Sequence, residues 1–80
     1  MGEGGFVKKN KRVALYRCIW AKIRYWQTVQ EIPDSELAEY LGVGERTLSV
    51  YDKSAEHVTL GKLDSFLKLN GMELADLLAL

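Results

Sequence analysis

Residues that perform catalysis or bind metal ions in other proteins are few and scattered along this chain. Its one cysteine, Cys18, has no second cysteine or nearby histidine to complete a metal site or a nucleophile–base pair. His57, the one histidine, lies in a polar stretch where we expect it to be solvated. Asp34 and Glu36 are better explained as acids at the positive end of a helix. The sequence therefore predicts no enzyme, no metal site and no cofactor.

The basic residues, by contrast, gather at one end and predict a surface able to bind an anion. The 80 residues include 11 basic and 11 acidic ones, so the formal net charge is zero. Through Gln30 the one acid is Glu3, and the basic residues are Lys8, Lys9, Lys11, Arg12, Arg17, Lys22 and Arg24. After Gln30 the acids outnumber the basic residues. The zero sum argues against a nucleic-acid ligand, whereas the basic end favours one.

Length and composition predict a single folded domain. With 48% apolar and 28% charged residues, the chain has the composition of an ordinary globular protein. One unpaired cysteine fits a reducing compartment, and no apolar run approaches the roughly 20 residues that a membrane span needs. The glycine-rich start lacks the apolar stretch of a signal peptide. We therefore expect a cytoplasmic protein, either a complete small regulator or one domain of a longer chain.

Apolar spacing predicts that five helices must position these charges. The predicted helices cover residues 13–30, 34–41, 45–53, 60–69 and 72–80, with a polar loop at 54–58. Pro33 separates the first two helices, Gly42 ends the second, and Thr59 can cap the fourth. No strand-like alternation interrupts this pattern. The expected fold is all-α, with an extended first helix, a domain over 13–80 and a flexible basic arm over 1–12.

The same spacing predicts which side chains form the core. The expected inward residues are Leu15, Ile19, Ile23, Trp26, Leu37, Ala38, Leu41, Leu48, Tyr51, Leu60, Leu63, Phe66, Leu67, Leu74, Leu77 and Leu78. A second set on the first helix, Val13, Tyr16 and Trp20, makes that helix apolar around more of its circumference than one core contact requires. This second set is explained either by ordinary packing or by an interface.

The pattern from Leu37 to Asp52 predicts a short helix, a turn that begins with glycine, and a second short helix. Two helices pack at a steep angle in this way, and the small Ala38 lets the second helix approach closely. Val43 is placed to fill the corner between them. The sequence of this stretch is Leu-Ala-Glu-Tyr-Leu-Gly-Val-Gly-Glu-Arg-Thr-Leu-Ser-Val-Tyr-Asp.

This stretch resembles the phage-repressor (Cro/cI-type, XRE-like) helix-turn-helix family, whose usual pattern is Leu-Ala, two variable residues, Leu-Gly-Val-Ser, two variable residues, then Thr-Ile-Ser. The resemblance continues without gaps, from Ile23-Arg24 in the first helix to Gly71-Met72 and the leucines that follow. It covers about residues 19–78. It implies a five-helix, lambda-repressor-like DNA-binding domain.

The resemblance also implies which residues would touch double-stranded DNA. The helix from Glu45 would lie in the major groove. The implied base-reading residues are Gly44, Glu45, Arg46, Ser49 and Val50. Among them Arg46 is the strongest candidate, because a guanidinium pairs bidentately with guanine O6 and N7. The implied phosphate contacts are Lys53 and Ser35. The basic arm lies outside the resemblance; it is either a solvated end or a further DNA contact through Lys8, Lys9, Lys11 and Arg12.

Several positions depart from the family pattern, including Asn70, which replaces a usual apolar residue. Asp34 replaces a glutamine that often donates to phosphate. Gln27 and Asp52 stand where the family often has an Arg–Glu ion pair, and we expect a hydrogen bond between them instead. Gly44 replaces the usual serine and offers the helix start no side-chain acceptor.

Two functions follow as expectations. The first is a sequence-specific transcriptional regulator of the repressor type, binding as a homodimer to half-sites about one DNA turn apart. The dimer surface would be the segment Leu77–Leu80, or Tyr16 and Trp20. The alternative is a protein-interaction or antitoxin-like module with the same fold, which the acids Asp34 and Glu45 favour.

Overall fold

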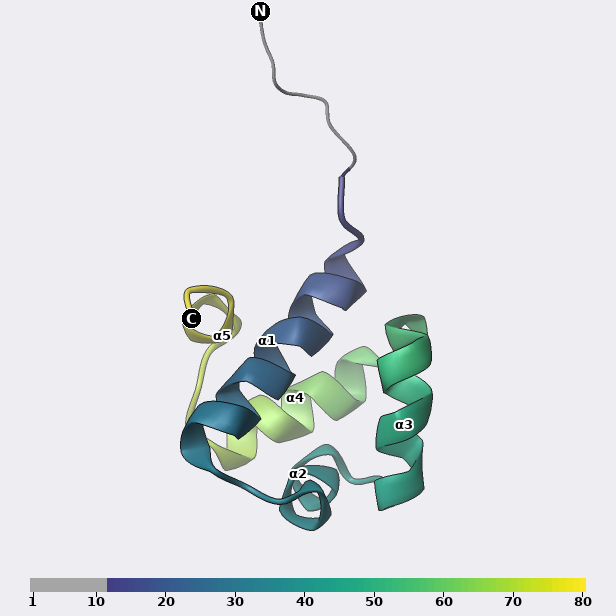
Figure 1. Cartoon of the computed structure of the whole chain (residues 1–80). Coiled ribbons are helices and arrows are strands. Elements are labelled where there is room, and N and C mark those ends of the chain that lie inside the picture. The colour runs from purple at the N-terminus through teal and green to yellow at the C-terminus, as the bar shows by residue number, and fades with distance from the viewer. Residues whose placement is uncertain (1–11) are drawn as a thin grey trace, which may run out of the picture.

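The computed structural model describes residues 12–80, which fold into five α-helices and one short 3₁₀ helix (Figure 1). The elements are α1 (Leu15–Gln30), α2 (Asp34–Leu41), α3 (Glu45–Lys53), η2 (Ala55–His57), α4 (Leu60–Leu69) and α5 (Leu74–Leu78). The described range contains no β-strand, which confirms the predicted all-α fold class with five helices. None of these helices combines the length and apolarity that crossing a membrane requires.

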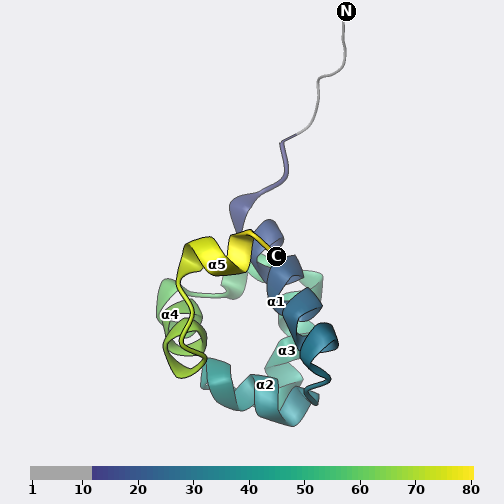
Figure 2. The same cartoon turned by 90° about the vertical axis from the view of Figure 1, so that its left-hand side faces the viewer.

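The core lies where the helical spacing of the sequence predicts it, at the centre of the ring of helices (Figure 2). Its fully buried side chains are Ile23, Leu37, Leu41, Leu48, Phe66 and Leu77. Each comes from a different turn of the chain, and all five α-helices contribute at least one. Burial of a large apolar side chain stabilises the fold by about 1.5–3 kcal/mol, so these six positions account for much of the driving force.

An aromatic cluster joins α1, α2 and α4 beside this core. The ring of Trp26 meets Phe66 edge to face with centroids 5.0 Å apart, and it meets Tyr40 at 6.2 Å. Edge-to-face pairs of this kind add about 0.5–1.5 kcal/mol beyond the area that they bury. The cluster fixes the end of α1 against the pair α2 and α4.

Four predicted core residues are wrong, because they lie in the first or last turn of their helices and are exposed there. Leu15 in the first turn of α1 is exposed, since α1 begins at Leu15 rather than at residue 13 and its first turn extends past the other helices (Figure 1). Leu60 opens α4 and is the most exposed large apolar residue among residues 12–80. Leu74 and Leu78 flank the buried Leu77 on the short α5 and are partly exposed.

Local capping explains where the helices end. Thr59 caps α4 as predicted, its hydroxyl accepting a hydrogen bond from the backbone N–H of Lys62 at 3.2 Å. Glu73 and Asp76 form a reciprocal capping box, so α5 begins at Leu74 instead of Met72. The expected loop at 54–58 contains η2, because Ala55 turns inward and is buried.

Candidate nucleic-acid interface

The helix α3 separates its side chains cleanly into an inner and an outer face. Leu48 and Tyr51 point into the core and are buried. Arg46, Ser49 and Val50 are exposed, and with Lys53 they follow the i, i+3, i+4, i+7 spacing that aligns residues along one face of a helix. We call these four residues and Glu45 the outer face of α3.

The turn between α2 and α3 sets the angle at which this outer face is presented. Gly42 has φ +74°, a left-handed conformation that favours glycine, and its N–H donates to the carbonyl of Glu39 at 3.1 Å. The next N–H, that of Val43, donates to the carbonyl of Ala38 at 3.0 Å, and the Val43 side chain packs against the core. Ala38 is buried, and its small side chain leaves room for α3 to lie close to α2.

Lys62 of α4 ties the same turn to the body of the protein. Its ammonium group donates a hydrogen bond of 3.2 Å to the carbonyl oxygen of Gly42. This carbonyl belongs to the left-handed residue that ends α2, where the negative end of a helix favours a cation. Local sequence patterns do not predict this contact, because the two residues lie 20 positions apart.

Arg24 of α1 connects the first residue of α2 with the penultimate residue of α3. Its Nε and Nη2 donate to the two carboxylate oxygens of Asp52 at 3.1 and 2.8 Å, a bidentate pair. Its Nη1 donates to Asp34 at 2.9 Å and to the amide oxygen of Gln27 at 2.6 Å. We call this group of four side chains the Arg24 clamp. Three helices thus meet at one guanidinium.

The predicted hydrogen bond between Gln27 and Asp52 is therefore wrong. Arg24 lies one helical turn before Gln27 and reaches Asp52 first, so the ion pair with the end of α3 is formed from a different position. The amide nitrogen of Gln27 instead donates to Asp34 at 2.8 Å and to the carbonyl of Ile32 at 3.0 Å. Gln27 is almost fully buried, and these partners satisfy its amide.

Trp20 of α1 contacts both Asp52 and Arg24 of the clamp. Its indole N–H donates to Asp52 at 2.8 Å, and the guanidinium of Arg24 lies 5.4 Å from the centre of its ring. The Trp20 ring also meets Tyr51 edge to face at 5.2 Å. Trp20 is buried, which confirms ordinary packing for it, whereas Tyr16 and Val13 from the same set are exposed.

The clamp keeps both of its carboxylates ionised. Hydrogen bonds from Gln27 and then from Arg24 hold the pKa of Asp34 below its ordinary value. The hydrogen bonds from Arg24 lower the pKa of Asp52, and the hydrogen bond to Asp52 in turn raises the pKa of Arg24. One guanidinium faces two carboxylates, so the Asp34 charge near the start of α2 is partly compensated rather than free to repel a phosphate.

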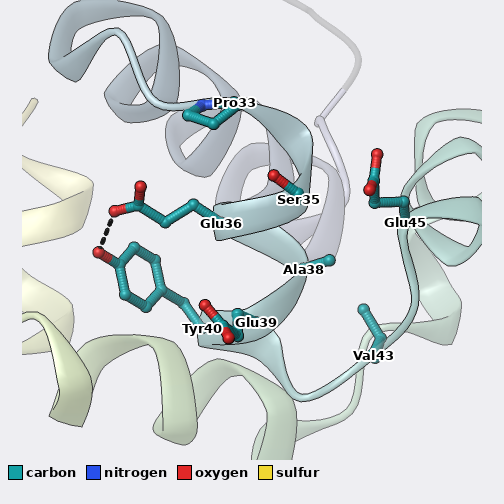
Figure 3. A pocket seen from close by; sticks show the side chains of 8 residues that line it. All are labelled: Pro33, Ser35, Glu36, Ala38, Glu39, Tyr40, Val43 and Glu45. Atoms are coloured by element: carbon teal, nitrogen blue, oxygen red, sulfur yellow. Dashed lines mark hydrogen bonds between the residues drawn. The ribbon is translucent and has the colours of Figure 1, made fainter.

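A shallow groove runs beside the outer surface of α2 and the start of α3 (Figure 3). Ala38 and Val43 lie between the two helices at its floor, and Ser35 lies across it from Glu45. The remaining lining residues are Pro33, Glu36, Glu39 and Tyr40, with the Tyr40 hydroxyl donating to Glu36. Three carboxylates and no basic side chain line the groove.

The predicted contact residues are only partly brought together. Gly44, Glu45, Arg46, Ser49, Val50 and Lys53 are all exposed on or beside α3, and Ser35 is exposed on the facing edge of α2. Arg12 is exposed before the start of α1, while Lys8, Lys9 and Lys11 lie outside the described residues. Gly44 is the N-cap residue of α3 and, having no side chain, provides no acceptor for the first N–H groups of the helix.

One cation that was not among the predicted contact residues, Arg17, lies near this surface. Arg17 of α1 lines the same cleft as Lys53, with Tyr16 and Glu56 also on its walls. The clustering of basic residues before Gln30 was the available signal, but it did not distinguish Arg17 from its neighbours. The cleft also includes Asp52, so two cations and two acids line it.

Cys18 is half-buried and free, and His57 is exposed. Among residues 12–80, no group of three or more His, Cys, Asp or Glu side chains is arranged to hold a metal ion. Comparison of the chain with protein-family models, with curated proteins and with solved structures gives no match.

Proposed function

We propose that the chain is a sequence-specific DNA-binding regulator of the repressor type, which binds double-stranded DNA as a pair of copies and reads the major groove with α3. The observation that supports this most directly is the outer face of α3. Arg46, Ser49 and Val50 form an exposed row on a helix whose opposite side is buried. A helix held in this way can enter a groove about 12 Å wide without unfolding.

Each residue of the outer face has a chemical role in this proposal. Arg46 pairs with guanine through two parallel hydrogen bonds, and Val50 contacts a thymine methyl group. Glu45 accepts from cytosine N4, and Ser49 donates or accepts. Lys53 contacts phosphate and sets the register without reading sequence.

The Arg24 clamp and Lys62 support the proposal through rigidity. Both ends of the unit formed by α2, the turn and α3 are tied to α1, and the turn is tied to α4, by charged hydrogen bonds. Base readout depends on side chains held within a fraction of an ångström, and a helix fixed at its turn and at its C-terminal end meets that requirement.

Selection from a pool of random duplexes, followed by fluorescence anisotropy at several salt concentrations, tests the proposal. We expect an enriched half-palindrome. Arg46→Ala should weaken binding to it by about 10- to 100-fold and relax the preference at one base pair. Lys53→Ala should weaken binding to all sequences alike and flatten the salt slope by about 1. Lys68→Ala, an exposed cation on α4, serves as the matched control and should change nothing.

Deletion of residues 1–12 tests the contribution of the basic arm. The deletion removes four cations, Lys8, Lys9, Lys11 and Arg12. If all four contact phosphate, the slope of log K against log salt should flatten by about 3.6, or 0.9 for each contact. An unchanged slope would exclude the arm from the interface.

Two results of the selection and titration experiments would refute the main proposal. The first is the absence of any enriched sequence, and the second is an Arg46→Ala protein that binds like the unmodified chain.

The acidic groove supports a second candidate, a protein-interaction or antitoxin-like module. Glu36, Glu39 and Glu45 would repel a DNA backbone but attract a basic protein surface. Titration calorimetry with the product of the adjacent gene distinguishes the two functions. Binding that is lost in Glu39→Gln while random duplexes are not discriminated would favour the module over the regulator.

A further inference from the structure

The C-terminal end of α3 and the first two turns of α1 border a cleft of about 440 Å³. Both segments lie at the same end of the molecule (Figure 1). Two exposed cations line the cleft, Arg17 from α1 and Lys53 from α3. We call it the α1–α3 cleft. Because Lys53 also belongs to the outer face of α3, the cleft is continuous with the surface that we propose to meet DNA.

One of the two acids in this cleft is already satisfied by neighbouring donors. Asp52 accepts two hydrogen bonds from Arg24, at 3.1 and 2.8 Å, and one from the indole N–H of Trp20 at 2.8 Å. Its charge is therefore offset by a guanidinium that does not line the cleft. The other acid, Glu56, forms no ion pair with another described residue. Two cations and one uncompensated acid remain, so the cleft favours an anion.

We propose that the α1–α3 cleft binds one phosphodiester group of the DNA backbone, held between Arg17 and Lys53. The hydroxyl groups of Tyr16 and Ser54, which line the same cleft, are donors of a kind that contacts DNA phosphates in other complexes. The inference rests on the proposed function for its ligand, and it extends the DNA interface to α1, a helix to which no DNA contact has been assigned.

The length of α3 places this cleft near the edge of the major groove. A helix of nine residues is about 13 Å long, which is close to the groove width of about 12 Å. When Arg46 near the start of α3 meets base edges, the C-terminal end of the helix lies near the phosphates that border the groove. Arg17 lies beside that end and approaches the same phosphates from α1.

Anisotropy titrations of the full chain against selected and random duplexes at several salt concentrations test the proposal. Arg17→Gln should flatten the slope of log K against log salt by about 0.9 and weaken binding roughly 5- to 10-fold near 0.1 M salt, equally for all sequences. Glu56→Gln removes the opposing acid and should strengthen binding to all sequences. Lys68→Gln and Asp64→Asn are the matched controls, because they make the same changes of charge at exposed residues of α4 that do not line the cleft.

Uncharged methylphosphonate linkages, placed one at a time along the selected duplex, identify the phosphate that the cleft binds. One linkage should weaken binding of the unmodified chain most. The same linkage should weaken Arg17→Gln and Lys53→Gln less, because each variant has already lost one of the two contacts to that phosphate. If the two variants lose sensitivity at different linkages, or at none, the two cations do not share a phosphate and the proposal is overturned.

The outcomes separate this proposal from the proposed function. An unchanged salt slope for Arg17→Gln, together with a base preference that depends on Arg46, would overturn the phosphate site and still support the regulator. Binding of random duplexes that depends on Arg17, without any enriched sequence, would refute the regulator and still support the phosphate site. A chain that binds no duplex at low salt would overturn both.

Discussion

Replacing Arg24 by methionine should destabilise the protein by about 2 kcal/mol near neutral pH. The bidentate pair with Asp52 and the bonds to Asp34 and Gln27 are charge-assisted, each worth about 1–2 kcal/mol before screening. The side chains of Asp34 and Asp52 are about half exposed, so solvent screening removes a large part of that sum. Methionine keeps an apolar stem over Trp20 and removes the guanidinium alone.

The effect of Arg24→Met should depend on pH in a defined direction. The pKa values of Asp34 and Asp52 are lowered in the folded protein, so the unfolded chain binds protons first as the pH falls. The stability that these carboxylates provide is therefore fully present above the ordinary aspartate pKa of 3.8. It is lost as the pH falls below that value and through the lowered folded values. The difference between the unmodified chain and Arg24→Met should close over the same window.

Urea denaturation followed by tryptophan fluorescence, from pH 7 down to about pH 2.5, measures this difference. At pH 7 the midpoint of Arg24→Met should fall by about 1–2 M. Arg17→Met is the matched control, because Arg17 is an exposed arginine of the same helix that forms no ion pair with another described residue. A stability difference that persists unchanged into acid would show that Arg24 acts by packing on Trp20, and would refute the ion-pair argument.

Other substitutions test the turn, the caps and the core. Gly42→Ala should destabilise by about 1 kcal/mol in urea denaturation, because φ +74° is unfavourable for alanine even though no atom blocks its Cβ; an unchanged midpoint would contradict that conformation. Gly61→Ala should stabilise by about 0.5 kcal/mol, since its Cβ meets only the Thr59 hydroxyl at 3.8 Å; a lower melting temperature would contradict this. Phe66→Ala should lower the free energy of unfolding by about 3–5 kcal/mol, because it removes a fully buried ring. A decrease below about 1 kcal/mol on thermal denaturation would show that Phe66 is not buried in the core.

The helix positions were predictable from the sequence because the apolar residues recur at helical spacing and the breakers are unambiguous. Ile23, Leu37, Leu48 and Phe66 are buried as that spacing predicts. Spacing identifies a face of a helix, but it does not tell how far along its axis a neighbour covers that face. Leu15 and Leu60 lie on the expected face of the first turn of α1 and α4, but they line an open groove and are exposed.

The candidate site was predictable on α3 and unpredictable where distant residues meet. The outer face of α3 follows from local periodicity, and its exposure confirms that arrangement of side chains. Two residues one helical turn apart on α1, Arg24 and Gln27, could bond to Asp52 at the end of α3. The side chain that is long enough to reach it becomes the partner. Arg24 has five N–H donors in a planar fork and spans both Asp34 and Asp52, whereas the shorter amide of Gln27 reaches only Asp34.

The clamp changes what the acidic residues of α2 and α3 imply for a polyanionic partner. As isolated charges, Asp34 and Asp52 would oppose phosphate from both ends of the helix-turn-helix unit. Held by Arg24, they become the structural charges that fix α3, and the unpaired acids that remain are those of the groove, Glu39 and Glu45 among them. The balance between DNA and protein as partner therefore rests more on this groove than on the clamp. Glu39→Gln should strengthen DNA binding if α3 enters the major groove, and should weaken protein binding if the groove is the contact site.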